Sequence, residues 1–125
     1  MDEYWPVLEP YIEKALVKTK GDDYYDTPDV LEEIKQGYCQ LWAVIHNHKV
    51  IGAVVSKIIQ YPKIKVLHMW LIGGDTLETL EDTYSTLKEY ALDNGCQRVM
   101  GSGRKGWTRL IKDTVNSEYT WTVDL

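Results

Sequence analysis

The sequence predicts a single α/β domain, residues 1–125, with a mixed β-sheet flanked by helices in the order ααβββαβαβ. Two observations support this prediction. Three nearly continuous apolar runs follow one another in the first part of the chain and indicate strands covered on both faces. An amphipathic helix then leads into a further apolar run, which is typical of a crossover between parallel strands. A chain of 125 residues is long enough for one hydrophobic core and too short for two.

Two helices are expected before the sheet. Apolar residues recur at helical spacing over residues 5–16, and Gly21 follows as a stop signal. The second helix is short, with Thr27 as its expected N-cap, Pro28 in its first helical position and Gly37 at its end.

Three strands are expected next, at Cys39–Ile45, Val50–Tyr61 and Ile64–Ile72. The turn His46–Lys49 joins the first two strands into a hairpin, and a second turn around Pro62 joins the second strand to the third. The long apolar runs are typical of strands that are covered on both faces.

The clearest helix follows these strands. Its apolar residues step by three and four positions and form one stripe: Leu77, Leu80, Tyr84, Leu87 and Ala91. Asn94-Gly95 ends this helix. A strand at Cys96–Gly103 is expected to lie parallel to Ile64–Ile72. A short basic helix over residues 104–113 and a last strand at Tyr119–Leu125 complete the order.

The composition of the chain argues against several classes of binding partner. The net charge of −5 opposes binding to nucleic acid or to an anionic membrane surface. No apolar run approaches the ~20 residues of a membrane-spanning helix, and no secretory signal is visible. Cys39 and Cys96 fit no metal-ligand spacing and are expected to be reduced. The cytoplasm is the expected location, which for a virus-encoded chain means the host cell.

The three histidines raise the alternative of a zinc site. If the turn around Pro62 is tight, the numbers of residues paired across it sum to about 125, so His68 lies opposite Lys57. That position is roughly 30 Å from His48, at about 3.4 Å per strand residue. The sequence therefore predicts no metal site from His46, His48 and His68.

The element order, with these lengths, resembles the GNAT superfamily of N-acetyltransferases. The second half of the chain more specifically resembles the small GNAT-like proteins encoded by tailed bacteriophages. Three short motifs support that resemblance: Gly73-Gly74 before the central helix, Asn94-Gly95-Cys96 at its end, and Gly103-Arg104-Lys105-Gly106-Trp107 after the next strand. The resemblance covers roughly residues 40 to 113.

The resemblance implies an acyl-transfer site. In the family, acetyl-CoA lies where two parallel strands separate, here Ile64–Ile72 and Cys96–Gly103, and its acetyl group passes directly to an amine. Backbone N–H groups before the central helix and the helix dipole take the diphosphate. The cofactor-binding candidates are Ile72, Gly73, Gly74, Asp75, Thr76 and Arg104.

The cofactor loop departs from the family pattern. Trp70, Leu71 and Ile72 stand where the family has an Arg or Gln, and Asp75 with Glu78 forms an expected capping box. A carboxylate about 8 Å from a phosphate repels it by about 0.5 to 2 kcal/mol. A helix N-terminus offers an exposed anion only about 0.3–1 kcal/mol. The sequence therefore predicts a degenerate cofactor loop and favours a self-capped helix start.

A second glycine turn, residues 101–106, matches GxGxxG. A dinucleotide-binding unit is excluded because too little chain follows it. From Asn94 to Lys112 there is no acid and there are five bases, so the turn is a candidate anion site that includes Arg104. A solvated basic face is the alternative interpretation.

Catalytic candidates are few. The position of the family's acidic Tyr falls near Leu110 or Ile111, neither of which donates a proton. His68 is the best internal base by chemistry, and Tyr119 is a further candidate. An acidic, Tyr-containing loop at residues 22–26 is suited to attracting a cationic amine, although such loops are commonly only solvated.

Two functional hypotheses remain open. The first is a phage-encoded N-acetyltransferase that uses acetyl-CoA and an amine substrate. The second is a non-catalytic protein of the same fold that serves as a virion component or binds a host protein. The fold alone does not decide between them.

Overall fold

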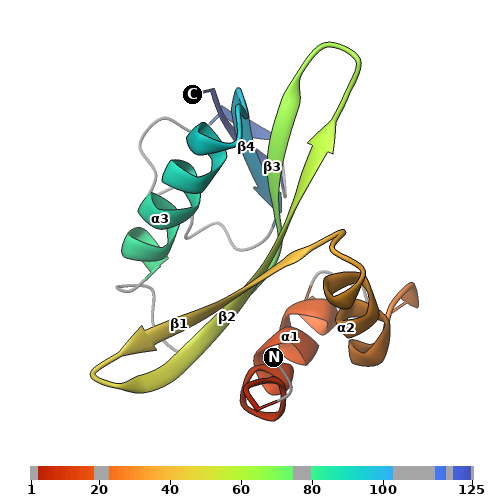
Figure 1. Ribbon diagram of the computed structural model, residues 1–125, viewed down its shortest axis with the longest axis vertical. Helices are drawn as coiled ribbons and strands as arrows, with labels where there is room; N and C mark the ends of the chain where they lie inside the picture. Colours follow the sequence, from red (N-terminus) through yellow and green to blue (C-terminus); the bar gives the residue numbers. More distant parts are fainter. Residues whose placement is uncertain (1–2, 19–22, 75–79, 103–114, 118–119, 125) are drawn as a thin grey trace.

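A computed structural model describes residues 3–18, 23–74, 80–102, 115–117 and 120–124 of the 125-residue chain (Figure 1). The helices are α1 (Trp5–Lys18), α2 (Thr27–Lys35) and α3 (Leu80–Asp93). The strands are β1 (Gln40–His46), β2 (Lys49–Gln60), β3 (Lys65–Gly74), β4 (Arg98–Ser102), β5 (Val115–Ser117) and β6 (Thr120–Asp124).

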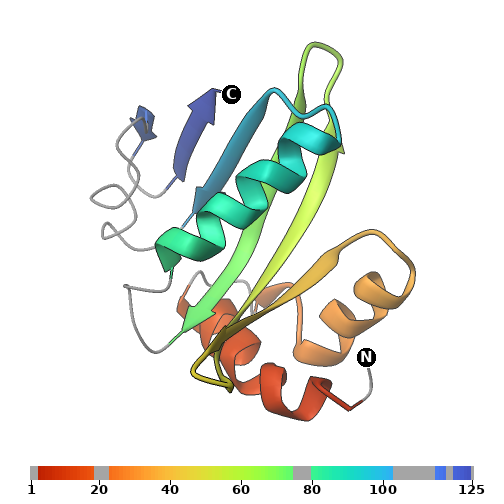
Figure 2. The same cartoon turned by 60° about the vertical axis from the view of Figure 1, so that its left-hand side comes forward.

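The strands of the described residues form one mixed sheet in the order β1-β2-β3-β4-β6-β5. β3 and β4 are parallel, and the other neighbours are antiparallel. α3 lies between the two parallel strands in sequence and on one face of the sheet, while α1 and α2 lie on the other face (Figures 1 and 2). The predicted α/β class, mixed sheet and crossover are confirmed.

Two buried apolar clusters lie on the two faces of the sheet. On the α3 side, Leu87 lies in one cluster with Leu67 and Met69 of β3. On the opposite side, Ile12 of α1 lies in a second cluster with Val55 of β2. All five side chains are at most 1% exposed. The strands are therefore covered on both faces, which explains why their sequences are apolar almost without interruption.

The predicted hairpin between β1 and β2 is confirmed. His46 pairs with Lys49, so the turn consists of Asn47 and His48, and both have positive φ angles of 50° and 64°. Two consecutive left-handed residues match the twist of the flanking strands, and asparagine adopts that conformation more readily than most residues.

The start of α2 corrects one expectation. The N-cap is Asp26 and not Thr27, which is the first residue of the helix. The backbone N–H of Asp29 donates to the Asp26 carboxylate at 3.3 Å, and the backbone N–H of Asp26 donates to the Asp29 carboxylate at 3.0 Å. This reciprocal pair is a capping box and satisfies two backbone N–H groups. The two side chains of a capping box lie three positions apart, and Asp29 is only two positions after Thr27.

The C-terminal region corrects another expectation. The predicted helix over residues 104–113 lies outside the described residues. β5 was not expected, and it pairs with β6, the strand predicted at Tyr119–Leu125 and found at Thr120–Asp124. A three-residue strand carries too few positions for an alternation to be visible in the sequence, so its existence depends on the partner strand.

Neither cysteine is in a disulfide. Cys39 and Cys96 are free and buried, and they lie just before β1 and β4. In the part of the chain that the structure describes, no helix combines the length and apolar character needed to cross a bilayer.

Ser56 of β2 is the centre of a buried polar chain on the α3 side of the sheet. The Trp42 indole N–H donates to its hydroxyl at 2.8 Å, and the hydroxyl donates to the Gln40 side-chain oxygen at 3.0 Å. Ser56 is fully buried, and Trp42 also makes an edge-to-face contact with Tyr90 of α3. The Ser56 hydroxyl therefore connects the β1 side chains Trp42 and Gln40 on the face of the sheet that α3 covers.

Ser56→Ala is expected to lower the free energy of unfolding by about 1–3 kcal/mol, because it removes the partner of a partly buried indole N–H and of an amide oxygen. Urea denaturation measures this change. Val17→Ala, at a side chain that is 57% exposed, is the control and is expected to change stability by no more than about 0.5 kcal/mol. Equal effects of the two substitutions would contradict the assignment.

Candidate functional site

β3 continues beyond the residues that it pairs with β4. The parallel pairing runs from Val66–Arg98 to Met69–Gly101, and β3 then extends to Gly74. Over this stretch β3 still pairs with β2 on its other edge. Figure 2 shows β3 running on past the end of β4. Within the described residues, no strand pairs with the β4-side edge of β3 from Trp70 onward, so its backbone polar groups there have no sheet partner.

A β-bulge lies at the same point. Ser56 pairs with Met69 but Val55 pairs with Leu71, so Trp70 is one extra residue on β3. Met69 lies in the α3-side cluster, whereas Trp70 and Leu71 both pack in the cluster on the α1/α2 side. Bulges are frequent next to functional sites because they redirect side chains. Here the bulge leaves Trp70 and Leu71 on the same face, toward α1 and α2, at the position where β3 leaves β4.

The two glycines that end β3 differ in their surroundings. A Cβ added to Gly73 would overlap the backbone of Tyr11 in α1, with the carbonyl carbon at 2.9 Å and the oxygen closer still. A Cβ added to Gly74 would meet, among the described residues, nothing nearer than the Ile51 carbonyl oxygen at 3.5 Å. Gly73 is therefore required for the packing of α1, while the exposed Gly74 leaves its backbone open to a ligand.

The predicted cofactor-binding residues fall into two sets. Three of them lie together at the end of β3: Ile72, Gly73 and Gly74. Three lie outside the described residues: Asp75, Thr76 and Arg104. Tyr119 and residues 103–106 of the second glycine turn lie outside them as well. The side chain of Ile72 packs against the α3-side cluster, so only its backbone can face a ligand on the open edge.

His68 lies opposite Lys57, as the predicted register requires. Burial first, and the Lys57 ammonium second, lower the pKa of His68 from 6.5 to about 4. The imidazole is therefore neutral near pH 7 but is a weak base. A general base works best when its pKa lies near the working pH, so this environment disfavours His68 in that role.

A group of residues on the α2 side was not singled out from the sequence. The Lys57 Nζ atom lies 4.2 Å from the ring centroid of Trp70, and Tyr25 meets the same ring edge-to-face at 4.9 Å. Tyr25 belongs to the acidic loop that the sequence marked, whereas Trp70 entered the sequence analysis only through the cofactor loop and Lys57 only through the strand register. Strand pairing and the packing of the loop before α2 bring these three side chains together, and neither is visible in the local sequence.

A buried thiol, that of Cys39, interacts electrostatically with Lys57. The Cys39 Sγ atom is 3.6 Å from a carboxylate oxygen of Glu33, to which it donates. Burial first, and the Glu33 carboxylate second, raise the pKa of Cys39 to about 11, with Lys57 acting in the opposite direction. The thiol is therefore protonated near pH 7. In the described ranges no group of three His, Cys, Asp or Glu residues is arranged to hold a metal ion.

The chain is similar to known proteins in its fold and not in its sequence. No protein-family model matches the sequence, and no curated protein matches it. The structure of the NatC complex bound to Gag peptide and CoA contains a chain with a TM-score of 0.73 and 9% identity, covering 94% of this chain and 87% of that one. The PaiA N-acetyltransferase of Thermoplasma acidophilum, in complex with coenzyme A, has a TM-score of 0.69 and 13% identity, covering 98% and 94%. Tetrahymena GCN5 has a TM-score of 0.64 and 11% identity, covering 98% and 86%.

These likenesses and the topology define the class of fold. The chain has the GNAT fold, with a mixed sheet, a crossover helix between two parallel strands, and helices α1 and α2 on the opposite face. The predicted GNAT-like architecture is confirmed.

Proposed function

We propose that the chain is an N-acetyltransferase that binds acetyl-CoA at the open edge of β3 and transfers its acetyl group directly to an amine. One observation carries this proposal: pairing with β4 stops at Met69–Gly101 while β3 continues to Gly74, in a fold whose solved examples include coenzyme A complexes. A strand edge without a partner offers the backbone donors and acceptors that an extended ligand needs.

The end of β3 fits a coenzyme A molecule in part. The backbone of Gly74 is open, and that of Ile72 lies on the same strand edge. Asp75, Thr76 and Arg104 remain predicted contacts. When bound, acetyl-CoA supplies the activated acyl group as a thioester. The residues of the chain bind and orient acetyl-CoA, and they hold the amine within reach of the thioester.

Calorimetric titration with acetyl-CoA and with CoA tests this proposal. We expect binding in the micromolar range and a weakening of about two- to thirty-fold on Gly74→Glu, because a carboxylate about 8 Å from a phosphate repels it by about 0.5 to 2 kcal/mol. Tyr61→Glu, at the opposite end of the β2–β3 hairpin, adds the same charge and is the control. No detectable binding at millimolar ligand would remove the proposal.

Glu78, which lies outside the described residues and is expected from the sequence near the start of the central helix, leads to a separate prediction. Glu78→Gln is expected to strengthen acetyl-CoA binding by about two- to thirty-fold, since it removes one repulsive carboxylate. The gain should shrink as salt is added, because screening weakens the repulsion that the substitution relieves. Glu13→Gln on the exposed face of α1 is the matched control. Unchanged affinity at low salt would show that these carboxylates do not oppose the diphosphate.

A second candidate function is favoured by two residues. His68 is a weak base facing a lysine, and Gly73 is required for the packing of α1. Both were predicted to serve chemistry or cofactor binding. A non-catalytic protein of this fold, acting as a virion component or as a binder of a host protein in the host cytoplasm, would tolerate both features. Mass spectrometry of purified virions tests the virion role, and absence of the chain there would remove it.

A further inference from the structure

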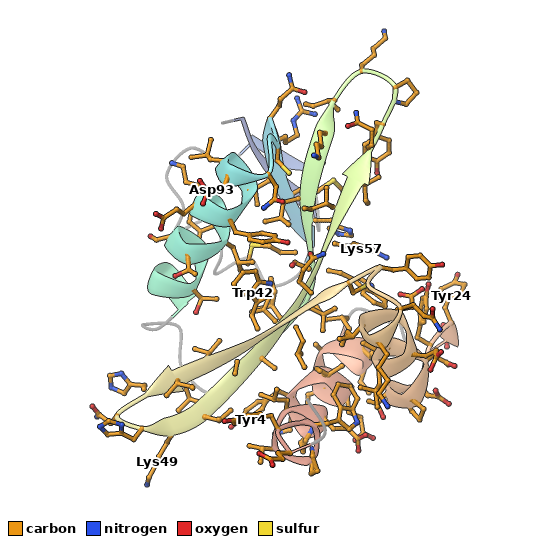
Figure 3. The ribbon with its side chains drawn as sticks, viewed as in Figure 1. Tyr4, Tyr24, Trp42, Lys49, Lys57 and Asp93 are labelled. Atoms are coloured by element: carbon orange, nitrogen blue, oxygen red, sulfur yellow. The ribbon has the colours of Figure 1, made fainter. Side chains whose placement is uncertain are left out.

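The Lys57 ammonium already occupies an aromatic surface. Its Nζ atom lies 4.2 Å from the centroid of the Trp70 ring, within the range of a cation–π contact. Tyr25 stands edge-to-face against the same ring, with centroids 4.9 Å apart. Lys57, Trp70 and Tyr25 are all partly exposed, so a molecule from solvent can reach this surface. Figure 3 shows Lys57 on the side of the sheet away from Trp42 and α3.

The position of Trp70 is set by backbone geometry. It is the extra residue of the β3 bulge and the first residue after the last pair with β4. Tyr25 immediately precedes Asp26. The capping box between Asp26 and Asp29 holds Asp26 at the start of α2. The aromatic pair therefore joins the residue before the α2 N-cap to β3, at the point where β3 loses its parallel neighbour.

The charges around this surface favour a cation. Among the groups that interact electrostatically with Lys57, His68 is neutral because its pKa is lowered to about 4, and the Cys39 thiol stays protonated because its pKa is raised to about 11. The Glu33 carboxylate, which accepts from Cys39 at 3.6 Å, is the nearby anion. If Lys57 moves away on its flexible stem, Glu33 remains to attract another ammonium group.

We propose that the face of Trp70, supported by Tyr25, binds a primary alkyl ammonium group of the acyl acceptor, and that Lys57 occupies this place until the acceptor displaces it. The inference takes from the proposed function only that the bound amine is an acyl acceptor. The acceptor would then approach from the α2 side of the sheet, while acetyl-CoA lies along the β3 edge that leads toward α3. Lys57 acts as an internal competitor that sets the concentration of amine required.

The test uses n-butylammonium without acetyl-CoA. Binding is followed by NMR through the five indole N–H signals, with the Trp70 signal assigned from a Trp70→Phe variant. We expect butylammonium to shift the Trp70 signal and uncharged n-butanol to leave it unchanged. Lys57→Met keeps an unbranched side chain but removes the ammonium, so it should bind butylammonium about two- to thirty-fold more tightly than the wild type.

Lys63→Met is the matched control, since it removes the same charge from the exposed turn between β2 and β3. Equal responses to butylammonium and butanol, or equal affinities of Lys57→Met and Lys63→Met, would overturn the inference. Calorimetry with acetyl-CoA on the same samples separates the two proposals. Ammonium binding without acetyl-CoA binding supports the cation site and removes acyl transfer, whereas acetyl-CoA binding without ammonium preference removes this inference alone.

Discussion

Gly73→Ala is expected to lower the free energy of unfolding by about 3 kcal/mol, at the upper end of the usual cost of overpacking. The added methyl would overlap the backbone of Tyr11, and backbone cannot move aside by changing rotamer as a side chain can. Relief requires α1 to shift away from β3, which would disturb the cluster that contains Ile12 and Leu71. Urea denaturation followed by circular dichroism measures the loss.

Gly74→Ala is the matched control for that substitution. The neighbouring glycine has an ordinary φ angle, and its added Cβ would lie at van der Waals distance from Ile51. We expect a change within about 0.5 kcal/mol, or a small gain from the reduced freedom of the unfolded chain. Equal losses for the two glycines would show that the contact with α1 does not explain Gly73. The pair also separates space for a side chain from folding, because an added Cβ is tolerated at Gly74 and not at Gly73.

His68 is expected to make the protein less stable in acid. Between about pH 6.5 and pH 4 the unfolded chain binds a proton at this residue and the folded chain does not. The unfolded state is therefore favoured increasingly as the pH falls through this window, and the full stabilisation is present above it. A shift from 6.5 to about 4 corresponds to about 3 kcal/mol, at 1.36 kcal/mol per pH unit.

The contribution of His68 is isolated by comparing the wild type with His68→Gln, because carboxylates titrate in both proteins. The loss of stability between pH 6.5 and 4 should be smaller in the variant by about 3 kcal/mol. With three histidines in the chain, NMR can follow the midpoint of His68 directly. Lys57→Met should raise that midpoint, but not to 6.5, since burial is the larger cause. A midpoint near 6.5 in the wild type would refute the assigned environment.

Local signals were sufficient for much of the fold. The tight turn after β2 predicted that paired residue numbers sum to about 125, and Lys57 does pair with His68. The stripe from Leu77 to Ala91 predicted α3, whose described part is Leu80–Asp93. The parallel pairing of β3 with β4 followed from the length of that crossover. Each of these features depends on residues close together in sequence, or on a connection whose handedness and length restrict the outcome.

The sites that bear on function were less visible. The sequence predicted that Gly73 and Gly74 both contact the cofactor, but α1 packs against Gly73 and not against Gly74. The acidic loop suggested an amine, yet nothing in it indicated that Tyr25 would meet Trp70. His68 was selected for its ordinary pKa, which burial and Lys57 then lower. In each case the deciding neighbour lies on a different element of the fold.

By itself, then, the sequence determined the α/β class, the order of the main elements, the hairpin register and the parallel crossover. The tertiary structure alone decided the bulge at Trp70, the packing of α1 on Gly73 and the placement of Lys57 over an aromatic ring. The physical reason is that β3 is apolar on both faces. A one-residue slip exchanges one buried face for the other with no visible change in pattern, so only the paired strand and the packed helices fix which way each side chain points.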